Sequence, residues 1–286
     1  MQERSHIIRK MEEEDLPGAM RLKEEVGWNQ TVTDWQFMLS DPHNHCLVAE
    51  REGRVAGTAV VVAYGSRLYW IGMVLVDKSC RGMGIGKHLM TTLIDGLDRG
   101  AVIKLDATPD GRRIYEKMGF RGEYEILRMA NPAVEVSPAV EEGAVVRAGA
   151  EDAAAVVRYD REVFGADRAG LIRYLLTSFP SQAWLLRQEG RPAGFLLGRE
   201  GSHSYQAGPL AASAVAAAQQ LLEKALASLS GRAVIVDVPE QQETLIRWLE
   251  ERGFVRQRSF LRMYLGTNIF SPKQDQQYLI SGPEYG

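Results

Sequence analysis

The two halves of the chain repeat one another, and this repeat restricts the fold more than any other feature. Four blocks recur in the same order: "HIIRKMEEEDLPGAMRL" with "AVVRAGAEDAAAVVRYD", "VAEREGRVAG" with "LLRQEGRPAG", "GRRIYEKMGF" with "TLIRWLEERGF", and "EILRMA" with "SFLRMY". Their separation is nearly constant, since Arg9 aligns with Arg147 and Phe120 with Phe254. Chance matches would not keep their register along the chain, so the sequence predicts two copies of one fold.

The stretch between the copies, "NPAVEVSPAVEEG", is typical of a linker because it carries two prolines and three glutamates. We therefore predict a first domain over residues 1–130, a linker over 131–143, and a second domain with a tail over 144–286. A length of 286 residues suits two domains. Apolar residues make up 45% of the chain, which is enough for ordinary globular cores.

Within the first copy, strand-like runs come first, and helix–strand alternation follows. "HCLVAEREGRVAGTAVVVAYG" predicts a hairpin that turns at Glu52-Gly53. "GIGKHLMTTLIDGLDRG" predicts a helix, because Ile85, Leu89 and Leu93 recur every four residues on one face. We predict an α/β (α+β mixed) architecture in which each copy is a mixed, mostly antiparallel twisted sheet flanked by helices.

A glycine-lined bend precedes that helix in "CRGMGIGKHLM". The first turn of a helix leaves backbone N–H groups unpaired, and the helix dipole adds positive potential there. Glycine lacks a Cβ, so an anion can approach the backbone closely. Arg81 and Lys87 add positive charge beside the bend. The pattern indicates a binding site for a phosphate-containing ligand.

Two nucleotide-binding motifs fit the bend poorly. A Walker A loop would need glycine where Arg81 stands and Ser or Thr where His88 stands. A dinucleotide fingerprint would need glycine in place of Lys87. By contrast, "RGMGIG" after "MVLVD" resembles the Arg/Gln-x-x-Gly-x-Gly/Ala signature of the Gcn5-related N-acetyltransferase (GNAT) superfamily. The resemblance covers residues 6–130 and includes the β-α-α-β-β-β-α-β-α-β order and the later "YEKMGF" block.

The resemblance implies acetyl-CoA as cosubstrate and assigns roles along the first copy. Tyr115 would act as general acid toward the leaving thiolate, since a phenol with a pKa of about 10 stays protonated at neutral pH. The backbone of residues 74–76 would pair with the pantetheine arm, and residues 81–87 would hold the pyrophosphate. The implied coenzyme-binding residues are Val74, Leu75, Val76, Arg81, Gly82, Met83, Gly84, Ile85, Gly86 and Lys87.

The general base and the acceptor pocket are less constrained. Asp34 or Glu25 would accept the ammonium proton, directly or through water, because an alkyl ammonium has a pKa of about 10.4. Trp28, Asn29 and Trp35 combine aromatic and polar groups suited to a cationic amine. Each has a structural alternative: the tryptophans suit a core equally well, and Asp34 suits the first turn of a helix.

The second copy lacks the glycine signature. Its corresponding stretch, "YQAGPLAASAVAAAQQLL", keeps only Gly208, followed by Pro209, which has no amide hydrogen to offer an anion. Trp248 is placed at the position of Tyr115. This arrangement resembles tandem GNAT proteins in which the second domain, of the YitH/HolE type, is degenerate. Asp160, Asp167 and Arg168 either face a shared cleft or cap and pair on a surface, and we favour the latter.

The predicted function is acetyl-CoA-dependent transfer of an acetyl group to a primary amine of a small molecule, by direct attack on the thioester. The alternatives are a non-catalytic acyl-CoA-binding regulator, a protein or peptide N-acetyltransferase, and a scaffold without affinity for coenzyme A.

Charge and residue usage predict the setting. A net charge of −3 predicts neither a nucleic-acid partner nor a membrane partner. Two cysteines, no secretory signal and no spanning segment predict a cytoplasmic protein. We expect it to be either a monomer or a homodimer. The scattered histidines predict no metal site.

Overall fold

The computed structural model describes residues 6–135 and 144–286, which form two compact units that divide between Lys104 and Leu105. Residues 136–143 of the predicted linker lie outside the described residues. The preceding residues are packed: Val134 is buried and donates its backbone N–H to the carbonyl of Arg232 at 3.0 Å. The predicted domain limits at residues 130 and 144 describe the sequence repeat and stay predictions. The compact units divide at a different place, before residue 130.

The first unit contains strands in the order β1-β2-β3-β4-β5. Neighbouring strands are antiparallel except β4 and β5, which are parallel. The elements, in chain order, are β1 (Ile7–Lys10), α1 (Leu16–Glu25), α2 (Val32–Ser40), β2 (His45–Arg51), β3 (Arg54–Tyr64), β4 (Leu68–Val76), α3 (Ile85–Asp95) and β5 (Val102–Ala107), the last of which reaches into the second unit.

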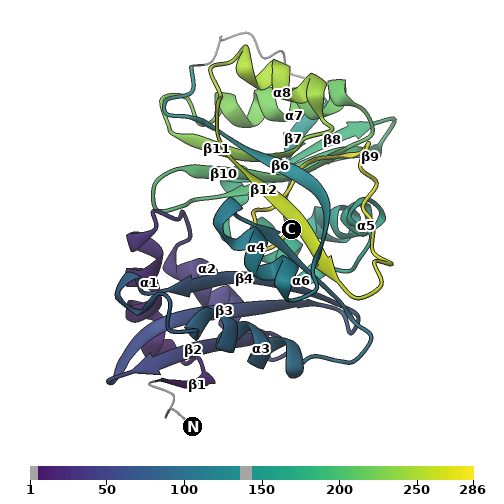
Figure 1. The fold of residues 1–286 in the computed structure, drawn as a ribbon. Coiled ribbons are helices and arrows are strands. Elements are labelled where there is room, and N and C mark those ends of the chain that lie inside the picture. The colour runs from purple at the N-terminus through teal and green to yellow at the C-terminus, as the bar shows by residue number, and fades with distance from the viewer. Residues whose placement is uncertain (1–5, 136–143) are drawn as a thin grey trace. The chain divides into compact units, whose positions relative to one another are not determined.

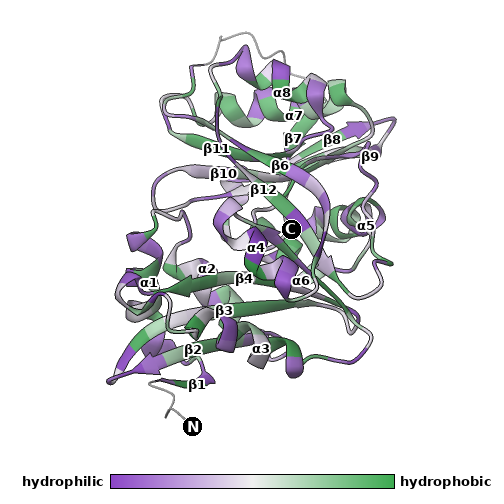
Figure 2. Ribbon diagram, in the orientation of Figure 1, coloured by the Kyte–Doolittle hydropathy of each residue, from purple (hydrophilic) through white to green (hydrophobic). Residues whose placement is uncertain are grey.

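Helix α3 packs closely on β3 because Gly57 has no side chain. A Cβ at Gly57 would lie 2.9 Å from the carbonyl oxygen of Leu75 and 3.1 Å from side-chain atoms of Ile85 and Leu89. The apolar face predicted for this helix is therefore its packing face. Strands β3 and β4 are hydrophobic along most of their length (Figure 2), as expected for strands covered by helices.

The second unit is a sheet with the strand order β12-β6-β11-β10-β9-β8-β7, and β13 pairs with β10. Its elements are α4 (Pro109–Lys117), β6 (Arg121–Asn131), β7 (Val145–Arg147), α5 (Ala153–Phe164), α6 (Ala169–Ser178), β8 (Trp184–Gln188), β9 (Arg191–Arg199), β10 (Tyr205–Ala212), α7 (Val215–Ala227), β11 (Val234–Pro239), α8 (Glu243–Glu250), β12 (Val255–Leu265) and β13 (Gln277–Leu279).

Strand β6 ends the first copy in sequence, yet it lies between β11 and β12 of the second copy (Figure 1). The arginine that is repeated in "EILRMA" and "SFLRMY" forms hydrogen bonds that attach β6 and β12 to other strands. Arg128 on β6 donates two hydrogen bonds, of 2.8 and 2.7 Å, to Asp237 on β11. Arg262 on β12 donates two, of 2.8 and 2.9 Å, to Asp106 on β5. All four side chains are buried.

Both copies end their last helix with the same hydrogen bond. Phe120 donates its N–H to the carbonyl of Tyr115, and Phe254 donates to that of Leu249, across a glycine with positive φ in each case. This equivalence corrects one sequence prediction: Leu249, not Trp248, occupies the position of Tyr115. The second copy therefore offers no polar group there at all.

Candidate functional site

Strand β4 has an open edge over its second half. It pairs with β3 along its length but with β5 only from Leu68 to Trp70. The β3 ladder shifts register between Thr58 and Val60, and Met73 adopts a φ of 53°, so β4 bends at this bulge. Within the described residues, no ladder covers the other edge of β4 from residue 71 to residue 76. The predicted pantetheine-pairing residues 74–76 lie on this stretch.

The bend between β4 and α3 leaves space around its glycines. Gly82 and Gly84 have φ values of 80° and 79°, which favour glycine, and a Cβ added to either would meet no atom within 4 Å. Gly84 is the N-cap residue of α3 and supplies no side-chain cap. The first-turn amides of residues 85–87 therefore keep the donor capacity that a pyrophosphate requires.

Two positively charged residues are next to these amides in the chain. Arg81 and Lys87 are both exposed. Within the described ranges 6–135 and 144–286, neither side chain forms an ion pair. The residues predicted for the pyrophosphate thus meet the two physical requirements of an anion site, which are amides that lack internal partners and mobile cations.

Three residues that the sequence analysis did not identify hold the bend in place. Asp77 accepts hydrogen bonds from the backbone N–H of Ser79 at 2.9 Å and from its hydroxyl at 2.6 Å. Arg21 of α1 donates to Asp77 at 2.7 Å. The Ser79 hydrogen bonds, with help from Arg21, lower the pKa of Asp77 to about 2. On the far side, Arg51 of β2 contacts the sulfur of Met83 at 3.0 Å.

Tyr115 lies on α4, in the second compact unit, with a half-buried side chain. Gly111 makes room for its ring, since a Cβ there would lie 2.9 Å from Cε2 of Tyr115. The ring centroid lies 5.9 Å from that of Phe120. Burial raises the pKa of Tyr115 to about 12, so the phenol keeps its proton throughout the neutral range.

The acceptor segment is more structural than its composition suggests. Asp34 is fully buried and forms a capping box with Thr31: it accepts the Thr31 N–H at 2.8 Å, and the Thr31 hydroxyl accepts the Asp34 N–H at 3.4 Å. Trp35 is also fully buried, and Asn29 is 6% exposed. Trp28 is half-buried and keeps some surface. Glu25 pairs with Arg21.

In the second copy the bend is absent rather than altered. Ser213 donates its N–H to the carbonyl of Ala193, and in the first copy Asp77 donates its N–H to the carbonyl of Ala56. Ser213 is therefore the equivalent of Asp77. Helix α3 begins at residue 85, whereas α7 begins at Val215, directly after Ala214. No segment corresponding to the glycine-rich stretch remains between strand and helix.

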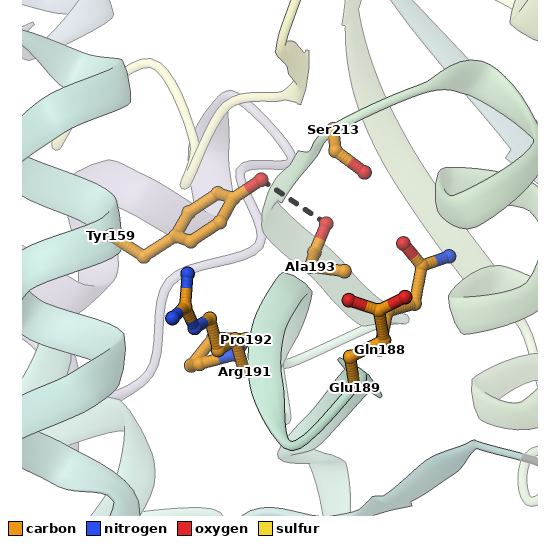
Figure 3. Close-up of a pocket in the computed structure, with 7 residues that line it drawn as sticks. All are labelled: Tyr159, Gln188, Glu189, Arg191, Pro192, Ala193 and Ser213. Atoms are coloured by element: carbon orange, nitrogen blue, oxygen red, sulfur yellow. Dashed lines mark hydrogen bonds between the residues drawn. The ribbon is translucent and has the colours of Figure 1, made fainter.

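A hollow of about 720 Å³ lies beside Ser213 in the second unit (Figure 3). The hydroxyl of Tyr159 on α5 points across it and donates to the carbonyl of Ala193 at 3.1 Å. Burial raises the pKa of Tyr159 to about 12. The hollow has no glycine-lined helix start, so it does not reproduce the bend of the first copy. Its lining residues are Tyr159, Gln188, Glu189, Arg191, Pro192, Ala193 and Ser213.

The predicted capping and surface pairing is confirmed for Asp167, which is exposed, pairs with Arg161 and accepts the Ala169 N–H at 2.9 Å. For Asp160 and Arg168 the predicted surface location is wrong. The two side chains form a doubly hydrogen-bonded ion pair, with both distances 2.9 Å, but each is at most 3% exposed. Among the described residues, His, Cys, Asp and Glu form no cluster of three or more suited to a metal ion. In the same part of the chain, no helix combines the length and apolar character needed to cross a membrane.

Comparison with protein families accounts for both copies. Residues 7–120 match the model of the acetyltransferase (GNAT) family, and residues 156–279 match that of an acetyltransferase (GNAT) domain. The chain belongs to the GNAT acetyltransferase family. It carries two GNAT domains, which confirms the predicted resemblance and fold class, and members of this family use acetyl-CoA as cosubstrate.

Individual relatives agree with this assignment. The chain is 24% identical over 245 residues to the uncharacterized N-acetyltransferase YitH of Bacillus subtilis, covering 86% of each chain. It is 32% identical over 89 residues to the N-alpha-acetyltransferase RimI of Mycobacterium tuberculosis, which is 29% of this chain and 56% of RimI. A putative acetyltransferase of Pyrococcus horikoshii shares the fold with a TM-score of 0.81 at 23% identity, covering 100% of this chain and 98% of its own.

Proposed function

We propose that the first GNAT domain binds acetyl-CoA and that the chain transfers the acetyl group to a primary amine of a small molecule. The observation that carries the proposal is the open edge of β4 followed by the glycine bend. Backbone groups of Val74, Leu75 and Val76 would pair with the pantetheine amides. The bend from Arg81 to Lys87 would bind the pyrophosphate through amides and two cations.

Acetyl-CoA supplies an acetyl group activated as a thioester. The amine attacks the carbonyl carbon, a C–N bond forms, the C–S bond breaks, and the thiolate leaves. Tyr115 is our candidate general acid: its pKa of about 12 keeps the phenol protonated, so it donates a hydrogen bond to the thiolate as the C–S bond breaks, and the sulfur leaves as thiol or thiolate. The ammonium proton leaves through water toward Asp34, whose carboxylate is buried and has no surface of its own. Trp28, Asn29 and Trp35 remain our candidates for the acceptor wall.

A peptide N-terminus is a second candidate acceptor. It is favoured by the similarity to an N-alpha-acetyltransferase, although the chain covers only 56% of that relative. Both acceptors present a primary amine, so the same residues would perform the chemistry. They differ in the surface that must contact the acceptor.

A thiol-release assay with acetyl-CoA and a panel of amines tests the proposal. The panel contains alkyl diamines, amino acids, amino sugars and short peptides with free or blocked α-amines. We expect release with at least one small amine and little with blocked peptides. Strong release with free peptides alone would replace the small-molecule acceptor by the second candidate. Binding of acetyl-CoA without release for any amine would support a regulator instead.

A further inference from the structure

Residues 277–280 lie between strands β10 and β11 of the second unit, and a turn over residues 282–286 follows them. These strands form a parallel ladder only from Tyr205 to Ala207, as β4 and β5 do from Leu68 to Trp70. Beyond that point, however, β13 fills the gap. It pairs antiparallel with β10, Leu279 opposite Leu210.

Backbone contacts hold the segment on both sides. On β10, Leu210 and Ala211 lie opposite Leu279 and Gln277 in an antiparallel ladder. On β11, the carbonyl of Asp237 accepts the N–H of Ile280 at 3.0 Å. The inserted strand therefore bridges the two diverging strands and occupies the edge that stays open on β4.

The glycine retained in the second copy is explained by this insertion. A Cβ on Gly208 would lie 2.1 Å from the carbonyl oxygen of Ile280, and its φ of 140° also favours glycine. No other residue would allow the segment to approach so closely. Gly208 therefore belongs to the contact with residues 277–286 and is not a remnant of an anion site.

Side chains bury the segment as a ligand is buried in a pocket. Leu279, Ile280 and Tyr285 are fully buried. The carboxylate of Glu284 pairs with Arg199, and both side chains are 2% exposed. Arg168 adds a hydrogen bond to the backbone carbonyl of Gly286. The extended stretch 277–279 and its apolar neighbours have the features of a peptide added to a sheet edge, and the turn that follows carries the buried carboxylate.

We propose that the groove between β10 and β11 is a binding site for a peptide that is extended and apolar at its start and ends in a turn with one carboxylate, and that segment 277–286 is its ligand within the same chain. The second GNAT domain thus holds a peptide where the first holds the coenzyme, and it binds no acetyl-CoA. The comparison with the first domain rests on the proposed function. The peptide site itself does not.

Hydrogen exchange on the full chain tests the peptide site. We expect the Ile280 amide to exchange about a thousandfold more slowly than in an open chain. Glu284→Gln should reduce this protection by about tenfold, because it removes one partner of a buried ion pair. Glu243→Gln, at an exposed position on α8, is the matched control and should leave the exchange of the Ile280 amide unchanged. Open-chain exchange at Ile280 in the wild type would overturn the proposal.

Complementation provides a second measurement. A chain ending at Gln276 is refolded with and without a synthetic peptide of residues 277–286. We expect the peptide at about 100 times its Kd to raise the Tm by several degrees, whereas a scrambled peptide should not. No shift, or an equal shift with the scrambled peptide, would contradict the assignment.

Calorimetry with acetyl-CoA separates this inference from the proposed function. We expect one coenzyme per full chain. Two per chain would overturn the occupied groove and leave the first-domain site standing. The absence of any binding would instead refute the proposed function, while exchange and complementation still decide whether the peptide site exists.

Discussion

Strands β4 and β10 are equivalent elements of the two GNAT domains, and both part from a parallel neighbour after three paired residues. On β4 the freed edge leads into a glycine bend and the start of α3. On β10 the corresponding edge is paired with β13, and α7 begins almost at once. The same backbone framework therefore ends in an open edge in one domain and in a completed sheet in the other.

Under the proposed function, the second domain has its own residues where the first domain has its ligand. An open strand edge inside a protein leaves polar backbone groups without partners, which is costly unless a ligand or water satisfies them. The first domain would satisfy them with the coenzyme. The second satisfies them permanently with residues 277–280, which removes the need for the glycine bend.

We expect the largest effect from replacing the repeated arginines, Arg128 and Arg262. These substitutions test whether the repeated arginine forms an equally stabilising buried ion pair in both copies. Arg128→Met and Arg262→Met each leave a buried aspartate without its partner. Each should lower the free energy of unfolding by about 3–5 kcal/mol, measured by urea denaturation. Arg256→Met, at an exposed pair with Glu250, should cost less than about 1 kcal/mol. Losses as small as this control at both buried sites would contradict the equivalence.

Tyr115→Phe tests which domain performs the chemistry. The change removes the proposed proton donor and keeps the ring that packs on Phe120. We expect kcat to fall by about 100-fold or more with the KM for acetyl-CoA nearly unchanged, measured by thiol release. Because the pKa of Tyr115 is about 12, wild-type activity should show no loss from its ionisation below pH 9. Tyr159→Phe in the second domain is the control, and an equal loss there would argue against Tyr115.

Sequence patterns located the glycine bend because the backbone conformation of a turn depends on the residues within it. Gly82 and Gly84 have positive φ, and the helix begins at Ile85, immediately after the bend. The same holds for the hairpin at Glu52-Gly53, which turns at φ values of 52° and 73°. Strand and helix order followed from periodicity for the same reason.

Contacts between residues that are far apart in the sequence could not be predicted from local patterns. Arg21 and Arg51 support the bend from α1 and β2, and no local pattern distinguishes them from other exposed arginines. Asp34 forms a helix cap, and its role as a base stays a prediction, because a cap and a base can be the same residue type. The insertion of residues 277–280 between β10 and β11 joins segments some seventy residues apart, which repeat analysis does not reveal.

Gly84→Ala tests whether the bend binds the coenzyme or merely turns the chain. Gly190→Ala is a close control, since Gly190 has a φ of 75° and Gly84 one of 79°, both with open space around a Cβ. Both variants should lose about 1 kcal/mol of stability through backbone strain. Only Gly84→Ala should also weaken acetyl-CoA binding, by about tenfold in calorimetry, because it shifts the first-turn amides. Equal coenzyme affinity in the two variants would assign the bend a structural role alone.

Asp77→Asn is expected to have the smallest effect and sharpens the comparison with Ser213, its equivalent. The carboxylate orders the bend through Ser79 and Arg21, so its loss should weaken acetyl-CoA binding by about two- to fivefold, whereas Ser213→Ala should not. The pKa of Asp77 is lowered from 3.8 to about 2. Its stabilising contribution is therefore complete above pH 3.8 and is lost as the pH falls toward 2. Acid unfolding followed by circular dichroism should accordingly be less steep between these values in Asp77→Asn than in the wild type. An unchanged slope would mean that Asp77 does not stabilise the folded first domain, and the order of the bend would then depend on its glycines and on Arg51 alone.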